Sequence, residues 1–240
     1  MGAHGKLFGI GVGTGDPELL TLKGWKILRS VEIVAYPAGR KGQPTLPELV
    51  TKTYTQPHQQ HLPLPMPLNA DPTLWRTAWQ TATLSIVQHL RQGKTLAFVC
   101  EGSATVHSVF MHIWLGVKSK CPQASIEVIP GVSSLAIASS IAGIPLGLDQ
   151  DKLIIFPEFT NMADLEDALR WAEIIVLLNV APVYREVWQI LRAHKLLGCS
   201  HVVANAQYHW SDLTDRPLLN LPPLALLLVN RSHETALLGY

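Results

Sequence analysis

Charge and cysteine are both scarce in this sequence, and each shortage excludes a class of function. Charged residues make up 15% of the chain, and the formal net charge is only +1. A balance this close to neutral argues against a polyanionic partner such as nucleic acid. The cysteines, an odd number at wide spacing, form neither a disulfide framework nor a CxxC metal site, and we expect reduced thiols at Cys100, Cys121 and Cys199.

Long apolar runs are also missing. No stretch approaches the roughly 20 apolar residues that a membrane span needs, and the N-terminus lacks the apolar core of a signal peptide. The chain contains no internal repeat and no low-complexity tract. We therefore expect a soluble, cytoplasmic protein that does not contact a membrane.

What the chain does have is an alternation of short β-branched runs with longer amphipathic stretches. This alternation is typical of an α/β fold with a largely parallel sheet. Strands are predicted at 7–12, 32–36, 95–99, 126–129, 152–157, 173–180, 201–206 and 224–230. The polar stretch "LGLDQD" at 146–151 suggests a boundary, so we expect two α/β lobes, 1–148 and 149–240, with a ligand cleft between them.

Amphipathic spacing predicts helices between these strands. The segments 163–171 and 183–195 are two of them, and two more are better defined. In "TLKGWKILRS", Thr21 can cap a helix whose apolar stripe is formed by Leu22, Trp25, Ile27 and Leu28. A longer helix at 72–90 has apolar residues four apart, namely Leu74, Ala78, Ala82, Ile86 and Leu90. The four prolines of 56–67 predict an extended connection there instead of a helix.

The first strand runs into alternating glycines in "LFGIGVGTGDPELLTL". Their register does not match the G-x-G-x-x-G fingerprint of dinucleotide-binding proteins, and no Gly-Lys-Ser/Thr follows as in a P-loop. Without side chains, the strand end lets another backbone or a ligand approach closely. Asp16-Pro17 then suits the start of a helix. Two interpretations stay open at this point, a tight turn with no ligand and a ligand-binding loop.

Two further strand ends repeat this arrangement. "FVCEGSATVHSVF" (98–110) and "VIPGVSSLAIASSIAGIPL" (128–146) each place glycine and small or hydroxyl residues between a strand and a helix. Such loops expose backbone N–H groups to a ligand at the start of the helix. Together with the first loop, they suit a small, flat, polar molecule held by backbone groups.

These stretches, together with "AYP" at 35–37, resemble the tetrapyrrole methyltransferase family, the S-adenosylmethionine-dependent enzymes of cobalamin and sirohaem synthesis. The resemblance extends from Lys6 to about Arg231, and its wording is nearest to the precorrin-2 C20-methyltransferases. It implies two α/β lobes unlike a Rossmann methyltransferase, a homodimer, and S-adenosylmethionine bound in the cleft. It also implies methylation of precorrin-2, or its cobalt form, at C20. The alternatives are another tetrapyrrole such as uroporphyrinogen III, and a non-catalytic binding paralogue.

The resemblance also implies a set of cofactor-binding residues at strand ends. In this chain they are Thr14, Gly102, Ser103, Ala104, Val106, Ser133, Ser134, Leu178, Asn179, Ala206 and Ala225. Without the resemblance, Leu178 and Ala225 would be interpreted as ordinary strand core.

The loop after the third strand departs from the family pattern. The family carries Gly-Asp-Pro there and a tyrosine four residues after the aspartate, whereas this chain has Gly102-Ser103-Ala104 and His107. Two interpretations follow: backbone contacts suffice to bind the cofactor, or the site is weakened.

The other polar residues give no firm catalytic assignment. Asp16 and Glu101 lie at strand ends and are acid/base candidates, although helix capping alone explains Asp16. His107 and His112 are five residues apart, which does not suit a metal pair on one helix face, so no metal is predicted. The helical tryptophans are expected in the core or an interface, and they are Trp75, Trp79, Trp171 and Trp188.

Overall fold

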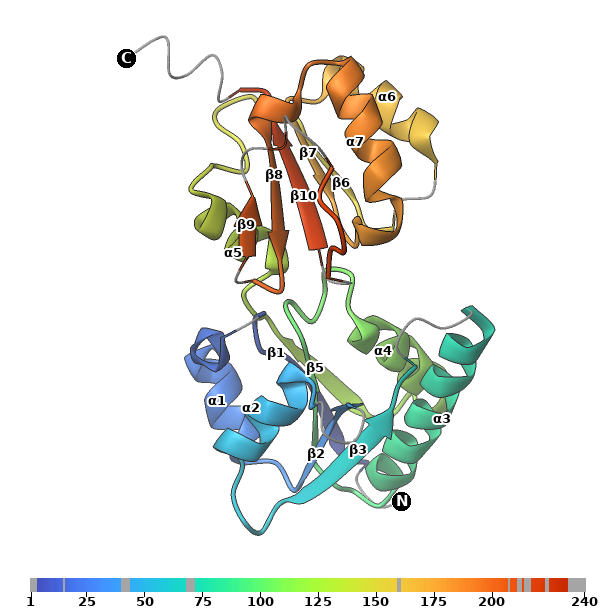
Figure 1. Ribbon diagram of the computed structural model, residues 1–240. Coiled ribbons are helices and arrows are strands. Elements are labelled where there is room, and N and C mark those ends of the chain that lie inside the picture. The colour runs from blue at the N-terminus through green and yellow to red at the C-terminus, as the bar shows by residue number, and fades with distance from the viewer. Residues whose placement is uncertain are drawn as a thin grey trace. The chain divides into compact units, whose positions relative to one another are not determined.

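The chain divides into two compact units, one up to Ser133 and one from Ser134 onward. The structure is a computed structural model (Figure 1) that describes residues 4–14, 16–39, 44–67, 72–158, 161–206, 208–210, 213, 217–222 and 225–232. Each unit has its own five-stranded sheet within this described part of the chain. The division lies before the helix that starts at Ser134, whereas the boundary suggested by the sequence lies after that helix.

The sheet of the first unit is entirely parallel. Its strand order is β3-β2-β4-β1-β5. The strands are β1 (Lys6–Gly11), β2 (Ile33–Ala38), β3 (Gln60–Pro65), β4 (Leu96–Cys100) and β5 (Ser125–Ile129). The helices are α1 (Leu22–Leu28), α2 (Leu46–Tyr54), α3 (Pro72–Arg91) and α4 (Val109–Lys120), with a short 3-10 helix η1 (Pro17–Leu19) after β1. Because all strands run the same way, their carboxyl ends share one edge of the sheet.

Two apolar clusters sandwich this sheet. On one face, α3 and α4 contribute Ile86 and Ile113 to a cluster with Phe98 of β4. On the other, Leu28 of α1 and Val50 of α2 pack with strand residues. Figure 1 shows the two helix pairs on opposite sides of the sheet. The predicted α/β layering is confirmed.

The proline-rich segment 56–67 contains a strand that the sequence did not reveal. Gln60–Pro65 pairs with β2 as β3, at the edge of the sheet. Proline lacks a backbone donor, and an edge strand is where a sheet tolerates that loss. The predicted extended conformation is correct, but its place in the sheet was missed.

The predicted apolar stripes are correct only in part. In α1 the cap is confirmed, since Thr21 Oγ1 accepts from Gly24 N at 3.1 Å. Leu28 is buried, but Leu22 is 66% exposed. In α3, Ile86 and Leu90 are buried, whereas Leu74 near the helix start is 58% exposed. The periodicity identifies each helix but not how far the sheet beneath it extends.

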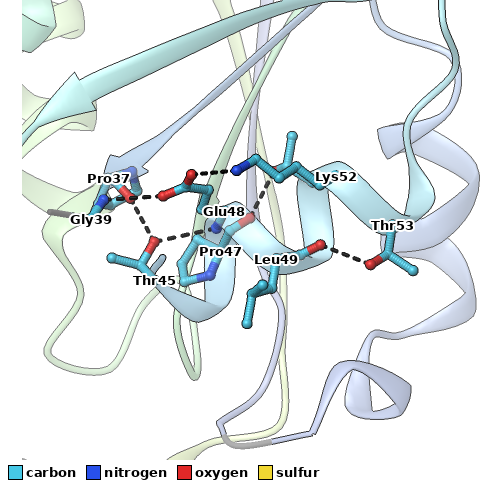
Figure 2. Close-up of polar contacts among 9 residues, drawn as sticks. Pro37, Gly39, Thr45, Pro47, Glu48, Leu49, Lys52 and Thr53 are labelled. Carbon is cyan, nitrogen blue, oxygen red and sulfur yellow. Dashed lines mark hydrogen bonds and ion pairs between the residues drawn. The ribbon is translucent and has the colours of Figure 1, made fainter. Parts of the chain in front are cut away.

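Polar contacts fix the start of α2 beside the carboxyl end of β2 (Figure 2). Thr45 Oγ1 donates to Pro37 O at 2.7 Å and accepts from Glu48 N at 3.3 Å. The Glu48 carboxylate accepts from Gly39 N at 3.2 Å and from Lys52 Nζ at 2.7 Å. The Lys52 hydrogen bond is the main cause of a lowered pKa at Glu48. This capping arrangement holds the "AYP" segment of β2 in place.

The second unit has a mixed sheet in the order β6-β7-β10-β8-β9. The strands are β6 (Leu153–Phe156), β7 (Ile174–Leu177), β8 (Ser200–Ala204), β9 (Tyr208–Trp210) and β10 (Ala225–Asn230). The helices are α5 (Ser134–Ala142), α6 (Met162–Trp171) and α7 (Tyr184–Ala193), with short 3-10 helices η2 (Ala181–Val183) and η3 (Leu197–Cys199). Helix α5 packs on one face of this sheet, and α6 and α7 pack on the other. Leu224, included in the predicted last strand, lies outside the described residues.

The tryptophans do not share one environment. Trp188 of α7 is buried, and its Nε1 donates to Leu213 O at 2.7 Å. Trp171 of α6 is exposed. Within the described residues, no helix is both long and apolar enough to cross a membrane.

Candidate functional site

Three backbones meet at the carboxyl edge of the first sheet. A Cβ atom added to Gly11 would lie 2.5 Å from Gly102 O and 2.8 Å from the backbone nitrogens of Ala104 and Gly131. A Cβ on Gly131 would meet the same backbone of Gly11 and Gly102. Distances this short leave no room for any side chain. Glycine is therefore required at these strand ends, and the loops after β1, β4 and β5 form one surface.

A two-way bridge connects the first two of these loops. Gly13 N donates to Gly102 O at 3.2 Å, and Gly102 N donates to Gly13 O at 2.6 Å. Both glycines have left-handed backbones, with φ of 77° at Gly13 and 66° at Gly102. Most residues with a side chain avoid this region. The predicted residue Thr14 follows directly and is partly buried.

The alternating glycines of the first loop thus have structural reasons of their own. A Cβ atom added to Gly9 would collide with the ring of Phe110, and one added to Gly13 would lie 2.6 Å from Leu19 Cβ. Asp16 Oδ1 accepts from Glu18 N at 2.8 Å, so the predicted helix cap is confirmed. Gly15 lies outside the described residues.

The loop after β4 contains a buried donor that no other described residue uses. Ala104 is fully buried, and its backbone N–H donates no hydrogen bond to any other described residue. A buried N–H without a partner is costly and calls for a ligand or water acceptor. Val106 is exposed on the same loop. The loop therefore holds a buried backbone donor that has no acceptor among the described residues.

Ser103 shapes this loop from within. The residue is only 7% exposed. Its Oγ accepts from Thr105 N at 3.3 Å and shares a hydrogen bond with Thr105 Oγ1 at 3.2 Å. His107 has a left-handed backbone, with φ of 49°, and the next residue, Ser108, caps α4. The altered loop is thus held by its own hydrogen bonds.

Ser133 and Ser134 follow the third strand end. Both are partly buried, and Ser134 is the first residue of α5. Of the predicted residues, the first unit therefore places Thr14, Gly102, Ser103, Ala104, Val106 and Ser133 on the loops at one sheet edge. Gly11 and Gly131 were not among the predicted cofactor-binding residues, although both belong to the glycine-containing strand ends noted in the sequence.

Besides Ser134, the predicted residues of the second unit lie at one edge of its own sheet. Leu178 and Asn179 follow β7, and Val180 N donates to Ala225 O at 2.9 Å. Ala225 begins β10 and pairs with Ala204, which is two residues before Ala206. Asn179 and Ala206 both have positive φ, at 51° each. Strained backbone of this kind is concentrated at ligand sites.

Leu178 and Ala225 have buried side chains. Both residues belong to the core, as the sequence alone suggested. Asn205, with φ of 52°, is a further strained residue at this edge. Nothing in its sequence context predicted that conformation.

The polar residues considered as catalytic or metal-binding candidates have different environments. The ring of His112 stacks on Trp79 with centroids 3.6 Å apart, which accounts for its position. Within the described part of the chain, no group of three or more His, Cys, Asp or Glu side chains could hold a metal ion. Glu101 is different, because it is partly buried between Cys100 and Gly102 and burial raises its carboxyl pKa.

Comparison with known proteins defines the class. The model of the tetrapyrrole (corrin/porphyrin) methylases matches residues 6–208, so the chain belongs to that family. The chain is 28% identical over 241 residues to the cobalt-precorrin-2 C(20)-methyltransferase of Salmonella typhimurium, covering 97% of this chain and 99% of that protein. It is 31% identical over 186 residues to the precorrin-2 C(20)-methyltransferase of a Sinorhizobium species, covering 73% of this chain and 74% of that protein.

Solved structures agree on the fold. The uroporphyrin III C-methyl transferase of Thermus thermophilus aligns with a TM-score of 0.67 at 18% identity, over 96% of this chain and 100% of that one. A structure of this type of enzyme from the same organism, complexed with S-adenosyl homocysteine, aligns with a TM-score of 0.64 at 19% identity, over 96% of this chain and 94% of that one. The expected tetrapyrrole methylase fold, distinct from a Rossmann methyltransferase, is confirmed.

Proposed function

We propose that this protein is an S-adenosylmethionine-dependent C-methyltransferase of cobalamin biosynthesis. Its substrate would be precorrin-2, or cobalt-precorrin-2, methylated at C20. Family membership supports the methyltransferase class, and relatives that match most of the chain support the substrate. The observation that carries the proposal is the glycine junction with the unused N–H of Ala104 beside it.

The residues at this junction fit the cofactor. The methionyl carboxylate of S-adenosylmethionine is an acceptor for backbone N–H groups, and the loop of Gly102 and Ala104 has such a donor in a buried position. The close backbones leave room for no side chain that would block the approach. We propose that the backbones at Leu178, Asn179, Ala206 and Ala225 bind the same molecule.

For the methyl transfer, the main task of the protein is then to align the two reactants. The cofactor supplies its methyl group as an electrophile, and the electron-rich tetrapyrrole supplies the carbon nucleophile. Holding two reactants in line and excluding water can contribute about 7–11 kcal/mol to lowering a barrier. Loops fixed by the Gly13–Gly102 bridge suit this task, since they cannot drift apart without breaking two hydrogen bonds.

Incubation with precorrin-2 and methyl-labelled cofactor tests the proposal. We expect one labelled methyl group per macrocycle, at C20, and a matched reaction with cobalt-precorrin-2 shows which form is preferred. Label in uroporphyrinogen III instead would move the activity to another member of the family. Calorimetric binding of S-adenosylhomocysteine without label in any tetrapyrrole would contradict the enzymatic proposal.

We also propose that the protein is a cytoplasmic homodimer. Large apolar side chains that a partner could cover are exposed on α3 and α4, and they include Leu74, Leu84 and Leu115. All three cysteines are buried and form no disulfide, which suits a reducing compartment. Light scattering during gel filtration is expected to give twice the mass of the 26.4 kDa chain.

A further inference from the structure

Glu101 is an unpaired carboxyl group beside the glycine junction. Within the described residues, its oxygens take part in no hydrogen bond and no ion pair. Its neighbour in sequence, Gly102, forms the bridge to Gly13. The residue is partly buried and directly follows β4, at the carboxyl edge of the sheet. An acidic group that is desolvated yet unpaired reduces stability, and such groups are concentrated where chemistry needs them.

Other carboxyl groups of this chain have partners that lower their pKa. Glu127 binds Lys6 and Lys23, and their hydrogen bonds lower its pKa to about 2. The lysine partners of Glu32 and Glu48 lower the pKa of those carboxyl groups as well. At Glu101 the pKa is raised, and loss of hydration is the cause. Among the described carboxyl groups whose pKa departs from the usual value, Glu101 is therefore the one prepared to accept a proton.

The Cys100 thiol and the Tyr36 hydroxyl carry no charge near neutral pH. Burial raises the pKa of the Cys100 thiol to about 12, so that thiol is neutral. Tyr36, buried on the neighbouring strand β2, also has a raised pKa and stays neutral. Asp16, beyond β1, is exposed and occupied in capping η1. The neutral Cys100 and Tyr36 therefore do not compete with Glu101 as proton acceptors.

We propose that Glu101 is the general base of the methyl transfer, an inference that rests on the proposed function. When a ring carbon that bears hydrogen gains a methyl group, the new C–C bond uses a π electron pair of the macrocycle. The bond between sulfur and methyl breaks, and its electrons stay on sulfur. The macrocycle is left with one positive charge. The C–H bond then breaks, its electron pair returns to the ring, and the proton moves to the Glu101 carboxylate and later to water.

The test compares Glu101→Gln with the parent and with Glu166→Gln, a matched change at an exposed position on α6. Glutamine keeps the shape of the side chain but cannot accept the proton. We expect kcat to fall on the order of 10²–10⁴-fold, the usual contribution of a positioned base. Binding of S-adenosylhomocysteine is expected to stay within about threefold, and Glu166→Gln is expected to behave like the parent.

Two further measurements separate chemistry from structure. With precorrin-2 deuterated at C20, Glu101→Gln should show a larger isotope effect than the parent, because proton removal becomes slow. Thermal stability at neutral pH should rise in Glu101→Gln, because a desolvated charge is removed, and the gain should vanish as pH falls and Glu101 becomes protonated. The sign follows from the raised pKa, since the folded state then binds the proton more tightly than the unfolded state.

The outcomes are distinguishable. Unchanged turnover in Glu101→Gln overturns the proposal, and so does a parallel loss of S-adenosylhomocysteine binding, which would make the carboxylate a cofactor ligand. If Glu101→Gln does not fold, Glu101→Asp provides the test instead. Because its base is shortened, Glu101→Asp should have a reduced but measurable kcat and the enlarged isotope effect expected of Glu101→Gln. A Glu101→Asp variant with the full activity of the parent and no isotope effect overturns it. A parent that methylates no tetrapyrrole refutes the proposed function itself.

Discussion

Gly11→Ala is expected to destabilise the first unit by about 3 kcal/mol or more, at the upper end of the range for overpacking. The added methyl group would lie 2.5 Å from Gly102 O and 2.8 Å from the backbone nitrogens of Ala104 and Gly131. All three are backbone atoms, so no side chain can rotate to make room. The strand ends would have to separate, and the loops that they carry would separate with them.

Urea denaturation with circular dichroism and tryptophan fluorescence measures this effect. The control is Gly198→Ala, because a Cβ at Gly198 meets nothing within 4 Å and the backbone there is not left-handed. That variant is expected to stay within about 0.5 kcal/mol of the parent. Equal stability of Gly11→Ala and Gly198→Ala would show that the junction is looser than described. The close contact of three backbones could then not be the reason for glycine at this site.

The sequence allowed most of the strands to be predicted because buried parallel strands are short, apolar and β-branched. The runs "LFGIGV" and "TLAFV" correspond to β1 and β4 within one or two residues. The edge strand β3 was not recognised, since its prolines are typical of loops and only the neighbouring β2 makes a strand of it. The buried face of each helix was also predicted only in part, because the exposure of Leu22 and Leu74 depends on where the sheet ends.

The candidate residues of the first unit were easier to predict from the sequence than those of the second unit. Glycine and hydroxyl residues at the ends of β1, β4 and β5 were visible in the sequence, so Gly102 and Ser103 could be chosen from their positions. The strained backbones of Asn179 and Ala206 could not be predicted from the sequence, because no local pattern requires a positive φ there. Those conformations depend on how β7, β8 and β10 pair, which is a long-range property. For Leu178 and Ala225, only the family resemblance suggested a role beyond the core.

Gly102→Val is expected to weaken binding of S-adenosylhomocysteine on the order of 100-fold or more. Gly102 has φ of 66°, a conformation that a β-branched residue adopts only at a cost of about 1–3 kcal/mol. Relief of that strain would break the two hydrogen bonds to Gly13 and move the unused N–H of Ala104. Every 1.4 kcal/mol of lost binding energy is a factor of ten in affinity. Calorimetric titration measures the loss directly.

Gly143→Val is the matched control for this prediction. Gly143 also has a left-handed backbone, with φ of 67°, but a Cβ there meets nothing within 4 Å. Both variants carry the same kind of backbone strain, so both are expected to lose stability. Gly143 follows α5 and lies outside the three loops of the glycine junction. We therefore expect Gly143→Val to bind S-adenosylhomocysteine as the parent does, provided that titration is done below the unfolding transition.

Ser103→Asp, a change toward the family pattern, is expected to have a much smaller effect. The Ser103 side chain already points into its own loop, where its Oγ accepts from Thr105 N, and an aspartate oxygen can accept the same hydrogen bond. If backbone groups bind the methionyl part of the cofactor, the affinity for S-adenosylhomocysteine should change by no more than about 1–2 kcal/mol. The contrary result is a gain of orders of magnitude in Ser103→Asp with parent-like binding in Gly102→Val. That pattern would mean that a side-chain acid, absent from this chain, normally binds the cofactor, and that the site here is weakened.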